Sequence, residues 1–156
     1  MTESLAQVGN YKLGELIGSY PEAKEYSWLE KRFVINSVPG ETLYKVPARV
    51  EVLGTQWVLV LGVYQGRIFK LSLRWGVDDW AAMTAKLYEV VEYCSAQYGS
   101  NANRTYGDAA VWATDFGNAA VTGRFTQSTL RSEGGFWFNL VMIESFAPAH
   151  APPQAG

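Results

Sequence analysis

The clearest pattern in the first half of the chain is an alternation of apolar and polar residues with a period of two. Over residues 44–52 the apolar positions are Tyr44, Val46, Ala48, Val50 and Val52. Successive side chains of a β-strand point to opposite faces, so this pattern predicts a half-buried strand over 44–52. Pro39-Gly40 before it suits a type II turn, which predicts a further strand over 33–38.

The same alternation continues through two hairpins. A two-residue turn at 65–66 pairs Tyr64 with Arg67 and Gly62 with Phe69, which predicts an aromatic ring lying over the strand glycine. Before it we expect a three-residue loop, 53–55, which aligns the apolar side of 44–52 with the even-numbered residues of strand 56–64.

Two segments have helical spacing instead. Ser19 and Glu22 match a capping box, and the residues that follow predict a first helix near 20–31. The second helix is predicted over 78–98, with Asp78 as its first cap and Gly99 after its end. Its expected buried stripe consists of Trp80, Met83, Leu87, Val90, Val91, Cys94 and Tyr98.

The last third of the chain returns to strands. Segments 108–116 and 119–127 predict a hairpin around Gly117-Asn118, with Trp112 opposite Gly123 and Ala110 opposite Phe125. The nearly continuous apolar run 136–146 predicts a central strand covered on both faces. The expected fold class is α+β, a mostly antiparallel sheet of six to seven strands with two helices packed on one side.

The domain boundaries follow from composition. The 156 residues are 48% hydrophobic, which fits one globular domain, and we place it at 11–146. Residues 1–10 are expected to be frayed. Residues 147–156 are rich in Ala and Pro and predict a disordered tail.

Charge and cysteine content narrow the partners and the compartment. A net charge of -2 provides no general attraction to nucleic acid, so no nucleic-acid partner is expected. No run of eighteen apolar residues occurs, so membrane insertion is not expected either. The single cysteine, Cys94, favours a reducing compartment and a soluble, cytoplasmic protein, or a periplasmic one if a signal peptide was removed.

The usual catalytic constellations are missing from the sequence. His150 is the only histidine and lies in the predicted tail, so no positioned imidazole base is available and no catalytic residue is assigned. One Cys and one His cannot form a zinc site, and no phosphate-binding loop occurs, so no metal or other cofactor is expected. Non-catalytic binding is therefore the leading functional class.

The predicted register places an apolar stripe with a charged border on one sheet face. The stripe consists of Trp57, Leu59, Leu61 and Val63, and its rim contains Arg49 and Arg74. Such a composition is typical of a protein-recognition patch, so the partner is another protein or a second copy of this chain. The competing interpretation is that the first helix or residues 11–17 cover the stripe, and that strand 56–64 is buried on both faces.

A second functional class also stays open. A small ligand or carbohydrate could bind, or be hydrolysed, in an aromatic pocket between the sheet and helix 80–98, beside Asp108, Asp115 or Arg124. Such a module should expose two or more of four tryptophans in one concavity. They are Trp57, Trp75, Trp112 and Trp137.

The order of elements resembles known small domains. The meander ending in Arg67–Trp75, the helix ending in Tyr98-Gly99 and the strand containing Trp112 are similar to bacterial α+β domains of the beta-lactamase-inhibitor-protein-like and outer-membrane-assembly-lipoprotein-like kinds, over residues 11–146. This resemblance implies a bacterial protein that binds other proteins through a sheet face or loops. We recognise no lipoprotein signal with its lipid-carrying cysteine in residues 1–156. No functional residue is transferred from these families.

Overall fold

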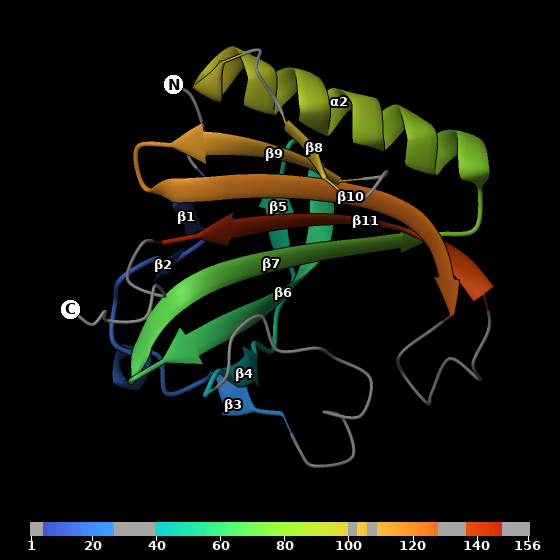
Figure 1. Cartoon of the computed structure of the whole chain (residues 1–156). Helices are drawn as coiled ribbons and strands as arrows, with labels where there is room; N and C mark the ends of the chain where they lie inside the picture. Colours follow the sequence, from blue (N-terminus) through green and yellow to red (C-terminus); the bar gives the residue numbers. More distant parts are fainter. Residues whose placement is uncertain (1–4, 27–39, 100–102, 106–108, 128–136, 148–156) are drawn as a thin grey trace.

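The computed structural model describes residues 5–26, 40–99, 103–105, 109–127 and 137–147 (Figure 1). Within these ranges eight strands form an antiparallel sheet in the order β3-β4-β6-β7-β11-β10-β9-β8, and β5 pairs with the start of β6. The strands of the sheet are β3 (Lys24–Glu25), β4 (Thr42–Lys45), β5 (Val50–Val52), β6 (Thr55–Tyr64), β7 (Arg67–Val77), β8 (Asn103–Thr105), β9 (Ala109–Thr114), β10 (Gly117–Gln127) and β11 (Trp137–Phe146). The α+β class and the antiparallel sheet are confirmed.

One helix, α2 (Trp80–Tyr98), is present in the described part of the chain. It begins at Asp79, whose carboxylate accepts a hydrogen bond from the Ala81 amide at 3.1 Å, so the cap is one residue later than predicted. It ends at Gly99, whose φ of +108° few other residues adopt. In Figure 1 α2 runs along β9 and β10, and it packs on one face of β7, β9, β10 and β11.

The predicted first helix is wrong where the structure describes it. Residues 24–25 form β3 and pair with β4, and the Tyr26 amide donates to the Leu43 carbonyl at 2.9 Å. Glu22 does not close a capping box, because its carboxylate accepts a hydrogen bond from the Tyr11 hydroxyl at 2.5 Å. Long-range contacts therefore replace the local helix, while 27–31 and the predicted strand 33–38 lie outside the described residues.

A β-bulge changes the register of the β6–β7 hairpin. The turn at 65–66 is as predicted, with Tyr64 opposite Arg67. After Val63 the pairing slips by one residue, so Gly62 faces Lys70 and Phe69 is the additional residue. The predicted pairing of Gly62 with Phe69 is therefore wrong. From this point, residues 71 and 73 share a face with 59 and 61, and Lys70, Ser72 and Arg74 point to the other face.

The turn before β6 also differs from the prediction. Leu53 and Gly54 have φ values of 52° and 72°, which form a two-residue turn that pairs Val52 with Thr55, so the three-residue loop is wrong. The predicted strand 44–52 is divided into β4 and β5, with residues 46–49 between them outside any strand.

The last hairpin turns two residues earlier than predicted. Gly117 pairs with Thr114, which places Trp112 opposite Ala119 and Ala110 opposite Val121 rather than opposite Gly123 and Phe125. A Cβ at Gly117 would collide with the Phe146 carbonyl, so glycine is needed where the hairpin approaches β11. β11 lies between β7 and β10, which confirms its central position.

The N-terminal residues are ordered from residue 5 onward. β1 (Gln7–Val8) and β2 (Tyr11–Lys12) form a hairpin, a 3₁₀ turn, η1, spans Ile17–Ser19, and Leu5 is 1% exposed. The prediction of a frayed segment over 1–10 is therefore wrong for residues 5–10. This segment and α2 contribute to one hydrophobic core on the same face of the sheet.

Candidate functional site

The predicted interaction stripe is part of the hydrophobic core. Trp57 and Leu61 are 0% exposed, Leu59 is 1% exposed and Val63 is 4% exposed. The assignment of these four residues to an exposed recognition surface is therefore wrong. The stripe belongs to the same hydrophobic core as Leu5, Val8 and Tyr11, whereas Val58 of the same strand is 37% exposed, so β6 is not buried along its whole length on both faces. The indole nitrogen of Trp57 donates to the Val52 carbonyl at 2.9 Å, so its polar atom is satisfied inside the fold.

Backbone hydrogen bonds attach residues 14–17 to the β6–β7 hairpin. The Gly14 amide donates to the Ile68 carbonyl at 2.7 Å, and the Ile68 amide donates to Glu15 at 2.9 Å. The Ile17 amide donates to the Gly66 carbonyl at 2.9 Å. These bonds attach the N-terminal segment, residues 5–23, beside β7, and its buried Leu5, Val8 and Tyr11 belong to the same hydrophobic core as the stripe.

Two tyrosines within this segment form a second anchor. The Tyr11 and Tyr20 rings lie 4.8 Å apart, and each hydroxyl donates to a carboxylate, that of Glu22 and that of Glu15 respectively. Burial, followed by the hydrogen bond to Glu15, raises the pKa of Tyr20 to about 12. Burial, followed by the bond to Glu22, raises the pKa of Tyr11 above its usual range, and that bond lowers the pKa of Glu22. The phenols stay protonated and serve as structural donors.

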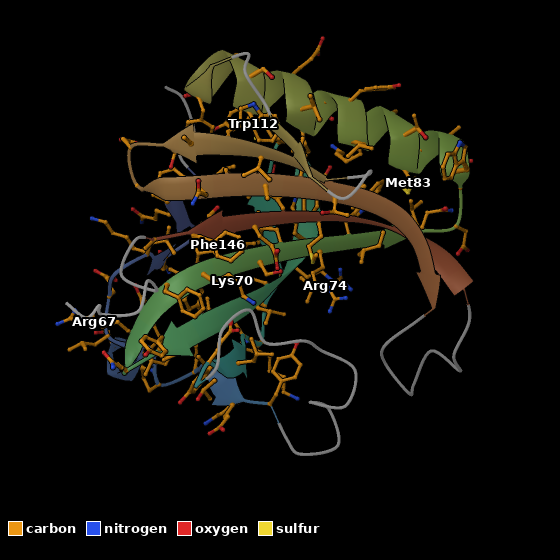
Figure 2. All side chains as sticks on the ribbon, viewed as in Figure 1. Arg67, Lys70, Arg74, Met83, Trp112 and Phe146 are labelled. Atoms are coloured by element: carbon orange, nitrogen blue, oxygen red, sulfur yellow. The ribbon has the colours of Figure 1, made fainter. Side chains whose placement is uncertain are left out.

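The two predicted rim arginines do not border the stripe. Arg74 lies on the second face of the sheet, opposite Val58 and Met142, because the bulge reverses the side on which it points. Arg49 is exposed between β4 and β5. Figure 2 shows Arg67, Lys70 and Arg74 spaced along β7. Arg74 and the apolar stripe therefore occupy opposite faces of the sheet.

The second face carries opposite charges that neutralise one another. The Lys70 ammonium lies 2.9 Å from the Glu41 carboxylate, and both side chains are almost completely buried. Ser72 donates to the Glu144 carboxylate at 3.4 Å. Gly62 makes room for the ion pair, since a Cβ there would come within 2.9 Å of Lys70 and would also collide with Glu41. Lys70 and Ser72 on this face therefore interact with carboxylates of the same chain.

The space between α2 and the sheet is packed where the structure describes it. Met83, Val90 and Cys94 are buried, and Leu87 lies so close to Gly123 that a Cβ there would come within 2.9 Å. Burial raises the pKa of Cys94 to about 12, which keeps its thiol protonated and unreactive. This packing argues against the aromatic pocket.

The residues named for that pocket are dispersed or lie outside the description. Trp57 and Trp112 are buried, Trp75 is half-buried and Asp115 is exposed. Asp108 and the side chains of Arg124 and Trp137 lie outside the described residues. The described ranges contain no cluster of three His, Cys, Asp or Glu residues that could hold a metal ion, and none of their helices is long and apolar enough to cross a membrane.

The exposed aromatic residues lie on α2. Among the described residues four large apolar side chains are exposed, and the two aromatic ones are Trp80, 63% exposed, and Tyr88, 67% exposed. Trp80 was predicted to belong to the buried stripe, and that prediction is wrong, because the buried residues of α2 are Met83, Val90 and Cys94. At 100° per residue, Tyr88 lies about 140° around the helix from the centre of this buried group.

We call Trp80, Thr84, Tyr88 and Glu92 the aromatic ridge. Their four-residue spacing places them in one row that winds gradually around α2, with the Cα atoms of Trp80 and Tyr88 about 12 Å apart along the axis at 1.5 Å per residue. Beside it lies a second row, Ala81, Ala85 and Glu89, which is exposed over its whole length. Small side chains next to two large rings leave an uneven surface into which another helix can pack.

No family model, no curated protein and no solved structure matches this chain.

Proposed function

We propose that this chain is a non-catalytic protein-binding module whose contact surface is the solvent side of α2. The observation that carries the proposal is the exposure of Trp80 and Tyr88, at 63% and 67%. Tyr88 faces away from the core, and Trp80 lies at the edge of the buried side of the helix. Trp and Tyr contribute most often to the few residues that dominate the binding energy of protein interfaces.

The packing of α2 on the sheet favours its role as a binding surface. α2 is anchored by Met83, Val90 and Cys94 on a broad antiparallel sheet, so the aromatic ridge is presented on a rigid element. A preformed surface loses little conformational entropy on binding. The families that the sequence resembles bind proteins through a sheet face or loops, whereas here we assign the contact to the helix.

The test is site-specific photo-crosslinking in cells that naturally produce the chain. A photoreactive phenylalanine analogue replaces Ala85, which lies beside the ridge and is exposed. We expect a discrete crosslinked adduct that disappears when Trp80→Ala and Tyr88→Ala are added. The control places the same analogue at Gln65, an exposed turn position away from α2.

Two outcomes contradict the proposal. One is an adduct at position 85 that survives both substitutions, and the other is crosslinking at 85 no stronger than at 65. Circular dichroism of each variant shows whether the fold is kept, which is expected because surface substitutions usually change stability by about 0.5 kcal/mol or less.

A further inference from the structure

The exposed part of α2 and the two residues that precede it have a local excess of negative charge. Four carboxylates, those of Asp78, Asp79, Glu89 and Glu92, occur between residues 78 and 99, and all four residues are exposed. Lys86 is the only Lys or Arg in this range. The local excess of negative charge is larger than that of the whole chain, whose net charge is -2.

Lys86 offsets one of these four negative charges. Its side chain is 12% exposed, and its ammonium donates to the Leu53 carbonyl at 3.3 Å, which directs it toward the β5–β6 turn. It also pairs with Glu89 at 2.8 Å. Glu92 is the charged residue of the aromatic ridge. The helical turn that follows it, residues 93–96, contains no lysine or arginine.

This charge distribution discriminates between the two partners considered for the chain. In a symmetric dimer, each surface meets an identical copy of itself. Two α2 helices in contact would bring carboxylates from both copies together, and like charges across an interface disfavour association. A second copy is therefore a poor occupant of this surface, whereas a partner rich in Lys and Arg complements it.

The shape of the surface indicates the kind of partner. The aromatic ridge and the neighbouring row of Ala81, Ala85 and Glu89 form the ridges and gaps that helices use to pack against each other. Exposed Trp and Tyr rings also attract the cationic groups of Arg and Lys that lie over their faces. Both features suit an amphipathic helix with an apolar stripe and basic edges.

We infer that the partner is a basic amphipathic helix of another protein, which lies on the aromatic ridge of α2 with its Lys and Arg residues next to Glu89, Glu92, Asp78 and Asp79. This inference rests on the proposed function and specifies the chemistry of its partner. The aromatic rings supply the apolar contact, and the carboxylates select the charge of the partner.

The experiment measures binding of synthetic amphipathic helices to the whole chain by fluorescence anisotropy. One peptide has a leucine stripe with lysine edges, a second has the same stripe with glutamate edges, and a third contains the residues of the first in an order without an apolar stripe. We expect only the lysine-edged helix to bind, with an affinity that falls as salt rises. Trp80→Ala with Tyr88→Ala should weaken it at least about tenfold.

A charge exchange supplies the matched control. Glu89→Lys with Glu92→Lys should remove binding of the lysine-edged helix and create binding of the glutamate-edged helix. Leu16→Ala, at an exposed apolar residue far from α2 in the sequence, should change neither.

The inference and the proposed function fail in different ways. Equal binding of the lysine-edged and glutamate-edged helices, equal binding of the third peptide, or no binding of any peptide overturns the basic-helix inference, while the crosslinking result decides the proposed function. Sedimentation over a concentration series should give a monomer. A dimer that Tyr88→Ala dissociates would overturn the inference in favour of a second copy.

Discussion

The Lys70–Glu41 pair shows how single residues shape the second face of the sheet. Both side chains are buried, and removal of one partner from such a pair usually destabilises a protein by about 3–5 kcal/mol, because the other charge loses its compensation. The pair lies over Gly62, which is the only glycine of β6. A side chain at this position would occupy the space that the pair fills. Glycine here is required by close approach, since its φ is not positive.

Gly62→Ala should therefore lower the free energy of unfolding by about 1–3 kcal/mol, which is typical of overpacking a filled interior. The added Cβ would come within 2.9 Å of the Lys70 Cβ, which cannot move without the strand. Urea denaturation measures the change. Gly18→Ala is the control, since nothing lies within 4 Å of a Cβ there, and equal stabilities of the two variants would contradict this account.

The tyrosine anchor of residues 5–23 makes stability depend on alkaline pH. Because the pKa of Tyr20 is raised from 10.0 to about 12 in the folded chain, the protonated phenol favours the fold. This contribution is complete below about pH 10 and is lost as the pH rises toward about 12. Urea denaturation at about pH 9 and about pH 11 should show a steeper loss of stability for the wild type than for Tyr20→Phe. Parallel losses would show that Tyr20 does not supply the effect.

At the scale of elements, the sequence pattern identified the long strands and the helix but not the residue-by-residue pairing of the strands. β6, β7 and α2 were predicted because their apolar residues repeat regularly, and β11 was predicted because its residues are almost continuously apolar. The bulge at Phe69 was not predictable, because the order of apolar and polar residues in the sequence is the same with or without it. The bulge changes the cross-strand partners and the faces of the residues that follow. The Phe69 carbonyl accepts a hydrogen bond from the Ala147 amide at 2.8 Å, a contact that local sequence cannot reveal.

The same limit explains the error in the candidate site. One slipped residue moved Arg74 to the face opposite Trp57, and residues 5–23 covered the stripe through contacts distant in the sequence. The exposed Tyr88 could have been found, because its helical angle lies far from Met83, Val90 and Cys94. Trp80 could not be recognised as exposed by spacing alone, since it lies near the edge of that apolar stripe.

The β6–β7 turn offers a test at this scale. Gln65 has a φ of 53°, a left-handed conformation that Asn adopts more readily than most residues and that suits the first position of an Asn-Gly turn. Gln65→Asn should raise the free energy of unfolding by about 0.5–1 kcal/mol. Gln65→Val, a β-branched residue at the same exposed site, should lower it. Urea denaturation compares the two, and the opposite order would contradict the turn assignment.

At the scale of the whole molecule, the structure separates a covered apolar stripe from an exposed aromatic ridge. Leu61 is 0% exposed and Tyr88 is 67% exposed. Leu61→Glu should destabilise the chain by at least about 4 kcal/mol, because it buries an unpaired carboxylate, whereas Tyr88→Glu should change stability by less than about 0.5 kcal/mol. Thermal unfolding followed by circular dichroism measures both. A stable Leu61→Glu variant would mean that residues 5–23 do not seal the stripe.

The central position of β11 has a consequence for biosynthesis. The ribosome makes β4–β7 first, yet the neighbour of β7 in the finished sheet is β11, which is made after α2, β8, β9 and β10. At about 5–20 residues per second, the hydrogen-bonding edge of β7 waits roughly 3–12 s for its partner. An open strand edge is prone to pairing with other chains. The nascent protein therefore passes through a period of vulnerability to aggregation that ends only when β11 leaves the exit tunnel and is inserted between β7 and β10.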